Sequence, residues 1–410
     1  MYGGVSTPPF RAAISEYPWW QSYVQSPLEN KPAHHKAPNH PSLSYSYHNN
    51  THLETQYRLL LSASSCLNLQ CLRSLPAQTL KAASQQTYVD AYASSPRLYA
   101  FGDFYYGPSV DGETLQDLPS TEFKRGHFTK IPLLVDHDGY EGYNYGNQSI
   151  TTPEDSRADL QTLWPSAKGS FFDRLEMLYP REEYNSSFWQ RQYLFGDFII
   201  NCPTQWMAAA VSDADLPAYK LVFNAGTQLH GATSPFLLQP EGSEGEFSLI
   251  FFSFKIGVPV CLLRRNLGGK EEEEVQSPEL PYPTNPLPPS PVLFPRGINA
   301  NTFFSLLFPA INNSTLAAYM KDWFISFVTH LDPNAQSFST PEISATKPFW
   351  PKYNGGGSGD GSGSGGDGDG EGEFEFNIMD VNYTQVGVVP DFDVSDKCDF
   401  WFGRGEVVKN

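Results

Sequence analysis

Apolar runs and helical stretches alternate along the first 240 residues of the chain. Residues 10–21 form an apolar stretch that predicts a buried strand with an exit turn at Pro18. Residues 131–135 are an uninterrupted apolar run, typical of a buried parallel strand, and residues 219–223 predict another strand. Helical patterning covers residues 55–61, 77–93, 171–179 and 187–211. This alternation predicts an α/β fold built on a sheet.

The pattern changes after residue 240. Residues 247–263 are apolar, residues 271–274 are glutamates, and residues 278–295 carry prolines at a density that no regular element tolerates. Order returns at residues 314–331, where apolar side chains share one face of a packing helix that Pro333 ends. Residues 354–373 are almost wholly Gly, Ser, Asp and Glu, the composition of a flexible linker.

These changes divide the chain into five predicted parts. Residues 1–239 form an α/β core, and residues 240–297 form an irregular insertion rich in proline and glutamate. Residues 298–353 add a helical part of the same domain, residues 354–376 a low-complexity linker, and residues 377–410 a C-terminal segment. Residues 26–52 and 240–297 are interpreted either as long surface loops or as translated intron sequence.

The composition is that of a globular protein and restricts its partners. Hydrophobic residues make up 40% of the 410 positions and aromatic residues 14%, which is enough for a sizeable core. The formal charge of −18 argues against nucleic acid and anionic membranes, because phosphate groups would repel the chain. The longest apolar run, residues 247–263, is interrupted and falls short of the roughly 20 residues that span a bilayer. We therefore expect a neutral, cationic or simply apolar substrate, of which a small apolar or neutral one is favoured, and no membrane span.

Two segments imitate metal sites. Residues 26–52 hold five of the nine histidines, but no ligand spacing is clean, so a polar loop is the favoured interpretation. Asp367, Asp369 and Glu371 resemble the opening of a calcium-binding loop, yet Ile378 stands where a bidentate glutamate is required. The sequence therefore predicts neither a metal nor a cofactor.

Three strings in order carry a family resemblance. They are FGDFYYGPSVDG at residues 101–112, GHFTKIPLLV at residues 126–135 and DGYEG at residues 138–142. They resemble the segments P-V-x-D-G, G-x-F-x-x-V-P-L-L and N-x-x-E-G of the type B carboxylesterases. This resemblance implies an α/β-hydrolase fold, of which the chain holds the C-terminal part with an incomplete sheet and long irregular insertions. It also implies that Glu141 is the acid of a catalytic triad, at the carboxyl edge of the sheet.

A fourth string supplies a histidine. QLHGATSPF at residues 228–236 follows the strand predicted at residues 219–223 and resembles the family's H-G-A-D-x-x-Y. The resemblance implies that His230 is the catalytic histidine, although a lone histidine is more often a packed or solvated residue. The string departs from the family at Thr233, where an aspartate is usual, and has Phe236 at the aromatic position.

The cysteines and glycosylation motifs suggest an oxidising compartment. Five cysteines cannot all pair within one chain, but the resemblance to the cholinesterase-like branch implies the pairs Cys66–Cys71 and Cys202–Cys398 and leaves Cys261 over. Acceptor triplets for N-glycosylation begin at Asn147, Asn185, Asn313 and Asn382, and also at Asn49 and Asn312. No signal peptide is predicted, because YGGVSTPP follows Met1. We nevertheless expect a secreted glycoprotein from the disulfide and acceptor patterns.

The serine nucleophile of such a site is missing from the sequence. In α/β-hydrolases the order is serine, acid, histidine, and the serine sits in Gly-x-Ser-x-Gly. No such string precedes Glu141; around Ser6 the match ends in Pro8. The sequence thus predicts no nucleophile in this chain, which would begin just downstream of the elbow.

Three hypotheses remain from the sequence. The first is a secreted serine carboxylesterase whose full-length form hydrolyses esters through Glu141 and His230, this chain being an inactive C-terminal part. The second is a non-catalytic cholinesterase-like binding or adhesion protein. The third is a gene-model fragment that does not fold stably, because an unpaired sheet edge favours aggregation. Retention of both Glu141 and His230 favours the first.

Overall fold

The computed structural model describes most of the chain in twelve segments. They are residues 8–20, 24–25, 50–94, 105–107, 109–110, 115–165, 167–238, 250–252, 260–262, 313–337, 341–354 and 376–408. Ser6, residues 26–49, most of the 240–297 insertion and residues 355–375 of the predicted linker lie outside them. The chain forms two compact units, residues 1–54, 97–238 and 301–410 in the first and residues 55–96 and 239–300 in the second. The five predicted parts stay a prediction.

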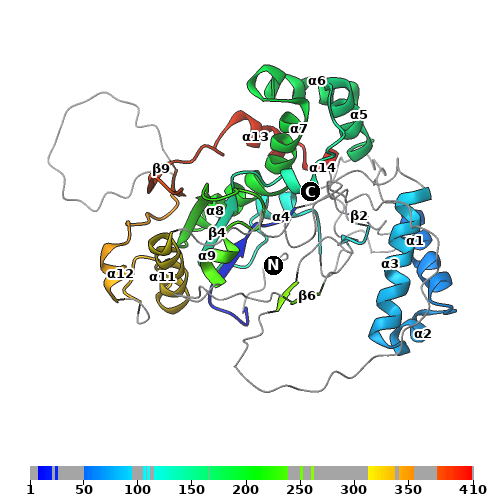
Figure 1. Ribbon diagram of the computed structural model, residues 1–410, viewed down its shortest axis with the longest axis horizontal. Helices are drawn as coiled ribbons and strands as arrows, with labels where there is room; N and C mark the ends of the chain where they lie inside the picture. Colours follow the sequence, from blue (N-terminus) through cyan, green and yellow to red (C-terminus); the bar gives the residue numbers. More distant parts are fainter. Residues whose placement is uncertain are drawn as a thin grey trace. The chain divides into compact units, whose positions relative to one another are not determined.

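A five-stranded sheet organises the first unit. Its order is β1 (Ala13–Glu16), β4 (Leu133–Asp138), β5 (Ala218–Phe223), β8 (Asn377–Val381) and β9 (Val386–Pro390). The first four strands are parallel and β9 is antiparallel to β8 (Figure 1). Every residue of β4 and β5 is buried. The parallel strand predicted at residues 131–135 starts later, at Leu133, and continues through Asp138, whereas β5 confirms the strand predicted at residues 219–223. The strand predicted at residues 10–21 shortens to β1, because the backbone leaves the sheet at Tyr17 with φ 51°.

Helices pack on both faces of this sheet. Along β4, Leu133 and Val135 face a core built with α6 (Gly169–Leu178), α7 (Ser187–Gly196) and α8 (Cys202–Ser212). Leu134 faces the opposite core, built with α9 (Ser234–Leu238) and α11 (Ser314–His330). These two cores around one sheet make the α/β architecture that the alternating pattern predicted. The remaining elements of the unit are β2 (Val24–Gln25), β3 (Ser109–Val110), α4 (Pro119–Lys124), α5 (Pro153–Leu163), α12 (Pro341–Thr346), α13 (Asp396–Phe402), α14 (Gly405–Val408) and two 3₁₀ turns, Tyr143–Tyr145 and Arg181–Glu183.

The helix predicted at residues 187–211 is interrupted. A π-helical turn, Asp197–Asn201, separates α7 from α8. Pro203 lies in the first turn of α8 and has no backbone N–H to pair with the preceding turn, so a locally wider turn accommodates it. The helix predicted at residues 314–331 is confirmed as α11. Asn313 caps its start and Leu331, with φ 62°, ends it two residues before Pro333.

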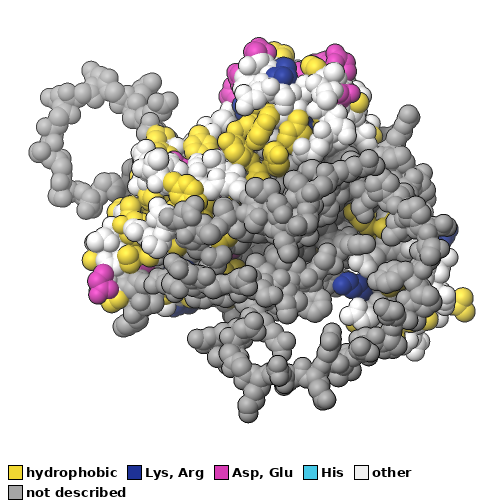
Figure 2. Space-filling view, viewed as in Figure 1, with side chains coloured by type: hydrophobic (Ala, Val, Ile, Leu, Met, Phe, Trp, Pro, Cys, Tyr) yellow, Lys and Arg dark blue, Asp and Glu magenta, His cyan; other side chains and the backbone are white. Residues whose placement is uncertain are grey.

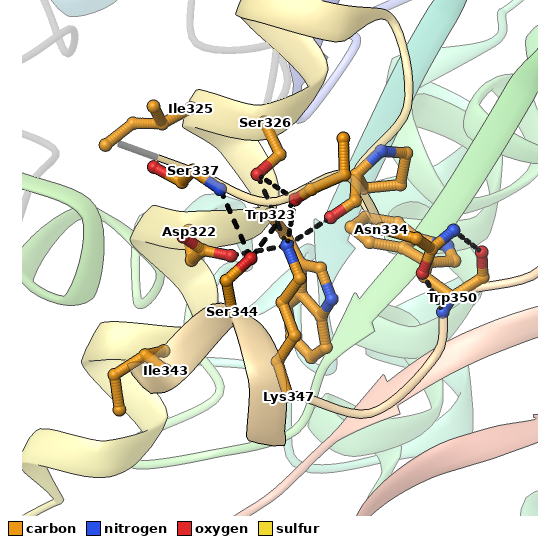
Figure 3. A network of polar contacts seen from close by, with 12 residues as sticks. Asp322, Trp323, Ile325, Ser326, Asn334, Ser337, Ile343, Ser344, Lys347 and Trp350 are labelled. Carbon is orange, nitrogen blue, oxygen red and sulfur yellow. Dashed lines mark hydrogen bonds and ion pairs between the residues drawn. The ribbon is translucent and has the colours of Figure 1, made fainter. Parts of the chain in front are cut away.

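A buried ammonium fastens the chain that follows α11. Lys347 Nζ donates to the Asp322 carboxylate on α11 and to the carbonyl oxygens of Pro333 at 2.6 Å and Ala335 at 3.0 Å (Figure 3). Asn334 completes the network through both its amide nitrogen and its carbonyl oxygen, which bind the main chain of Trp350 at 2.8 and 2.7 Å. The segment between α11 and Trp350 is therefore held by polar contacts as well as by burial of Trp350 against the sheet.

A disulfide and a second buried charge network hold the C-terminal segment. The structure forms Cys202–Cys398 across 196 positions of sequence, and closing so long a loop restricts the unfolded chain strongly. Lys220 Nζ on β5 donates to Asp391 at 2.6 Å and Asp393 at 2.5 Å, and His137 Nε2 on β4 lies 2.7 Å from Asp393. Against the opposing effect of burial, the charges of Lys220 and His137 lower the pKa of Asp393. The residues after β9 are thus locked to the sheet.

The second unit holds helices and a small hairpin. It contains most of α1 (Asn50–Ala63) and all of α3 (Ala77–Ser94), which confirm the helices predicted at residues 55–61 and 77–93, and also α2 (Leu69–Ser74), which was not predicted. The disulfide Cys66–Cys71 joins the turn after α1 to α2. β6 (Ile250–Phe252) pairs antiparallel with β7 (Val260–Leu262), which carries Cys261. Among the described helices, none is both long and apolar enough to cross a membrane.

Charged side chains are visible at the surface of the first unit. In the space-filling view, acidic and basic groups gather over the helices α5 and α6, next to apolar atoms (Figure 2). Arg157 of α5 forms two ion pairs at this surface, with Asp173 at 2.6 Å and with Glu176 at 2.7 Å. Both acids are on α6 and are largely exposed. This surface cluster gives a comparison for the buried network around Lys220.

We predict that Lys220→Met lowers the free energy of unfolding by about 3–5 kcal/mol, because it leaves the buried Asp391 and Asp393 without their cation. Urea unfolding of the purified chain measures this. Arg157→Met is the matched control, since Arg157 also binds two acids but at the surface, where less than about 1 kcal/mol is expected. Equal losses for the two variants would contradict a stabilising role of the buried network.

Candidate functional site

Glu141 lies in the turn that follows β4, at the carboxyl edge of the sheet. Tyr140 N donates to Gln228 O at 2.7 Å, so this turn pairs with the turn that follows β5. The Glu141 side chain is buried, and its two oxygens have different partners. Oε1 accepts from Asp138 N at 2.6 Å, and Oε2 lies 2.6 Å from His230 Nδ1. The structure therefore brings together the two residues that the sequence singled out 89 positions apart.

Close backbone packing fixes the position of Glu141. A Cβ on Gly142 would lie 1.9 Å from Gln192 O of α7, and a Cβ on Gly196 would lie 3.0 Å from Gly142 N. The first position therefore requires glycine, and the second leaves little room for a side chain. The turn that carries the acid thus rests directly on the helix that leads into the π-helical turn.

His230 lies in the turn between β5 and α9, and aromatic rings surround it. The ring centroids of Tyr17, Tyr145 and Trp19 lie 4.8, 5.4 and 6.2 Å from the imidazole centroid. Its side chain keeps 22% exposure, whereas Glu141 keeps none. The partners of the imidazole thus come from three places, namely the turn after β1, the turn after β4 and the 3₁₀ turn that ends at Tyr145.

The pair has the geometry of a histidine oriented by a carboxylate. An ionised carboxylate only accepts hydrogen bonds, so Nδ1 is the donor and carries the proton of a neutral ring. Nε2 is then the acceptor, and it makes no hydrogen bond to another described residue. This arrangement can accept a proton at Nε2 while the carboxylate stabilises the imidazolium that forms.

Three further carboxyl groups surround the pair. Asp136 and Asp138 are wholly buried on β4, and Glu16 is the register partner of Asp136 at the end of β1. Burial, followed by the charges of the neighbouring acids, raises the pKa of Asp136 and of Asp138 well above the ordinary value. Burial also raises the pKa of Glu16. Within the described segments, neither carboxyl oxygen of Asp136 has a hydrogen-bond partner.

Thr233 departs from the family pattern for a reason visible in this group. Its hydroxyl lies 3.4 Å from Glu16 Oε1, and the residue is fully buried. The hydroxyl donates to the Glu16 carboxyl group, whereas an aspartate at this position would place a second acid beside it. The departure at Thr233 coexists with the His230–Glu141 contact, and Phe236, at the aromatic position, packs on Phe223 of β5.

The described residues supply no metal site and leave the nucleophile open. No group of three or more His, Cys, Asp or Glu in the described segments is placed to hold a metal ion. The calcium-like string at residues 367–372 and Ser6, with its partial elbow string, lie outside those segments.

The glycosylation candidates lie at different places in the first unit. Asn185 is exposed. Asn313 caps α11 through its side-chain oxygen, which accepts from Leu316 N, and the oxygen of Asn382 accepts from Thr384 N in the turn between β8 and β9. Asn147 Oδ1 accepts from Ser149 N. Modification at these positions stays a prediction.

Comparison with known proteins places this geometry in a family. The model of the carboxylesterase family matches residues 49–359, about three quarters of the chain. The chain belongs to the carboxylesterase family. A secreted lipase of Arthroderma benhamiae is 26% identical over 185 residues, which cover 41% of this chain and 31% of the lipase. The crystal structure of Aspergillus niger EstA aligns with a TM-score of 0.60 and 16% identity, over 100% of this chain and 61% of EstA.

These matches confirm the family and the α/β-hydrolase type of fold. The chain spans less than two thirds of the length of either relative. Sequence reasoning singled out Glu141 and His230 from local strings, and their catalytic roles stay a prediction. It missed Glu16, Asp136, Asp138 and the aromatic rings of Tyr17, Trp19 and Tyr145. Asp136 and Asp138 could have been found from the string LLVDHD at residues 133–138, in which two acids directly follow an apolar run. Buried strands rarely carry acids, so this combination is a signal.

We predict that Asp136→Asn makes the stability of the chain less dependent on pH. A carboxyl group whose pKa is raised in the folded state binds more protons there than in the unfolded chain, so its contribution is full below the ordinary pKa near 4. That contribution is lost as pH rises through the raised value.

Urea unfolding at a series of pH values between about 4 and about 8 measures this. The variant should gain stability relative to the parent as pH rises. Asp173→Asn, which changes a largely exposed acid, is the control and should leave the slope unchanged. A parent chain whose stability rises steadily with pH, in parallel with that of Asp136→Asn, would refute the interpretation.

Proposed function

We propose that the chain supplies the acid and the general base of a serine-hydrolase site that hydrolyses carboxylic esters, with Glu141 orienting His230. The 2.6 Å contact between Glu141 Oε2 and His230 Nδ1 carries this proposal, together with membership of the carboxylesterase family. No cofactor is required by this chemistry, because the proton transfers run through side chains alone.

In this mechanism His230 Nε2 takes the proton of a serine hydroxyl as the serine attacks the ester carbonyl. The buried Glu141 carboxylate stabilises the imidazolium, and the low-polarity ring environment of Tyr17, Trp19 and Tyr145 strengthens that attraction. The imidazolium then gives the proton to the leaving alcohol. Water, activated by the same Nε2, releases the acid from the acyl-serine in the second half of the reaction.

A serine in the elbow motif is the part that the 410 residues do not contain. No Gly-x-Ser-x-Gly string occurs in the sequence. We therefore expect this chain to be inactive on esters by itself, and the activity to belong to a form in which such a serine reaches His230 Nε2.

The second candidate function is non-catalytic, a cholinesterase-like binding protein. The absence of the elbow string from the sequence is the observation that favours it. The retained pair favours the enzyme, since binding alone does not require a buried carboxylate to hold a partly exposed histidine in one tautomer.

Neutral and apolar esters suit the proposed site. The formal charge of −18 disfavours anionic substrates, and aromatic rings surround the histidine. The Arthroderma relative is a secreted lipase, which supports acyl esters as substrates and an extracellular location. The two disulfides and the acceptor motifs at Asn147, Asn185, Asn313 and Asn382 support the same location and glycosylation.

The test compares this chain with a longer gene product that carries Gly-x-Ser-x-Gly upstream of Glu141. The chain alone should not turn over a chromogenic short-acyl ester, and the longer form should. In the longer form, His230→Ala and Glu141→Gln should each lower kcat by about 10⁴-fold, because the base or its orienting acid is lost.

His127→Ala is the matched control, since His127 also lies near a buried glutamate, Glu122 at 3.6 Å, but is half exposed and follows α4 instead of lying in the turns that carry the pair. It should leave kcat unchanged. Turnover by the 410-residue chain that disappears in His230→Ala would contradict the missing nucleophile. A longer form without turnover, or with turnover indifferent to both substitutions, would favour the binding protein or another site.

A further inference from the structure

Asp138 contacts Glu141 and the two residues that follow His230. Its backbone N–H donates to Glu141 Oε1 at 2.6 Å. Its side-chain Oδ2 accepts from Gly231 N at 2.7 Å and from Ala232 N at 3.0 Å, the two amides that follow His230. One residue at the end of β4 therefore holds the acid from one side and the histidine-bearing turn from the other.

Two anchors tie the turn after β4 to the turn after β5. The first is the bond from Tyr140 N to Gln228 O, which fixes the histidine turn just before His230. The second is the Asp138 carboxyl group, which fixes the same turn just after His230 through the Gly231 and Ala232 amides. Between these two anchors the His230 imidazole points towards Glu141.

We propose that Asp138 is the positioning residue of the pair, and that it does this as a neutral carboxylic acid. This inference rests on the proposed function in one respect: the pair that Asp138 positions is the acid and the base assigned there. Asp138 itself touches neither a nucleophile nor a reacting atom.

The surroundings of Asp138 favour the neutral form. The ionisable groups that act on it electrostatically are Tyr17 from the turn after β1, Asp136 from β4 and Glu141 from the turn after β4, and the turn after β5 that it binds carries His230. Of these, Glu141 carries the negative charge that the histidine requires. A second full charge on Asp138 would repel it inside a region that water does not reach.

The hydrogen bonds from the Gly231 and Ala232 amides lower the pKa of Asp138 and so oppose the effect of burial, but the neutral form can keep both of them. Oδ2 holds both amides, while Oδ1 is buried and has no partner among the described residues. A proton on Oδ1 removes the charge and leaves Oδ2 as a carbonyl-type acceptor with its two N–H contacts intact. Burial, followed by the charges of Glu141 and Asp136, raises the pKa of Asp138 in the direction that this requires.

An asparagine has the same shape and the same acceptor as a protonated aspartate. Asp138→Asn should therefore preserve the pair, whereas Asp138→Leu, of similar size but without an acceptor, should release the Gly231 and Ala232 amides and with them His230. Asp136→Asn is the matched control, because Asp136 is equally buried on the same strand but its carboxyl group makes no hydrogen bond to the histidine turn.

The measurement is the low-field proton NMR resonance of the His230 Nδ1–H bond to Glu141, assigned by its loss in His230→Gln. The resonance should be present in the parent chain, Asp138→Asn and Asp136→Asn, and lost in a folded Asp138→Leu. Thermal unfolding of each variant separates this from stability, since a merely structural role would lower the melting temperature and leave the resonance of the folded protein in place. An unchanged resonance in Asp138→Leu would overturn the positioning role.

A second comparison serves if Asp138→Leu does not fold. As pH rises from about 5 to about 8, the parent chain should lose the resonance at lower pH than Asp138→Asn, because only the parent can ionise at this position. Identical pH dependence, or loss of the resonance in Asp138→Asn at every pH, would overturn the neutral form. The resonance needs no turnover, so it tests the positioning role in this chain whatever its esterase activity. The proposed function fails separately, if the longer form that carries the elbow serine does not hydrolyse esters.

Discussion

The parallel pairing of β4 with β5 is the constraint on which the site depends. Six consecutive residues are in register, from Leu133 opposite Ala218 to Asp138 opposite Phe223, and all of them are buried. Because the strands are parallel, they end at the same edge, and the turns that follow them carry Glu141 and His230. A one-residue slip would move every side chain of the strand to the opposite face and would displace the two turns relative to each other. The 2.6 Å contact therefore depends on the register that buries the apolar side chains of the two strands.

Successive side chains of these strands point to opposite faces of the sheet, so both faces carry buried ionisable groups. The two faces stabilise these groups in different ways. On one face His137 and Lys220 meet Asp391 and Asp393, so cations and anions compensate each other. On the other face the buried Asp136 and Asp138 have no cation partner among the described residues, and burial raises their pKa instead. Charge pairing thus stabilises the structural face, and protonation stabilises the face that adjoins the histidine.

The sequence predicted what is local and missed what depends on distant contacts. The buried strand at residues 131–135, the strand at residues 219–223 and the α11 helix followed from apolar periodicity, and Glu141 and His230 followed from short strings. The pattern missed β8 and β9, because two five-residue strands after a low-complexity stretch give no clear period. β8 is placed by its pairing with β5, and β9 by its pairing with β8. It also missed the break between α7 and α8, although Pro203 marked the position, and the role of Asp138, whose side-chain partners are separated from it by 93 and 94 positions.

The same packing of strands, turns and helices determines how solvent reaches Glu141 and His230. Glu141 is enclosed by the Gly142–Gly196 contact beneath it and by Asp138 beside it, so its carboxylate is directed to His230 and the main chain. His230 alone keeps partial exposure, with Tyr17, Trp19 and Tyr145 around its ring. An acid that water cannot reach and a base that remains partly accessible form an asymmetric pair, in which a proton can enter and leave only at Nε2. That asymmetry distinguishes this arrangement from the Lys220 network, where every charged group is buried and none is available for exchange.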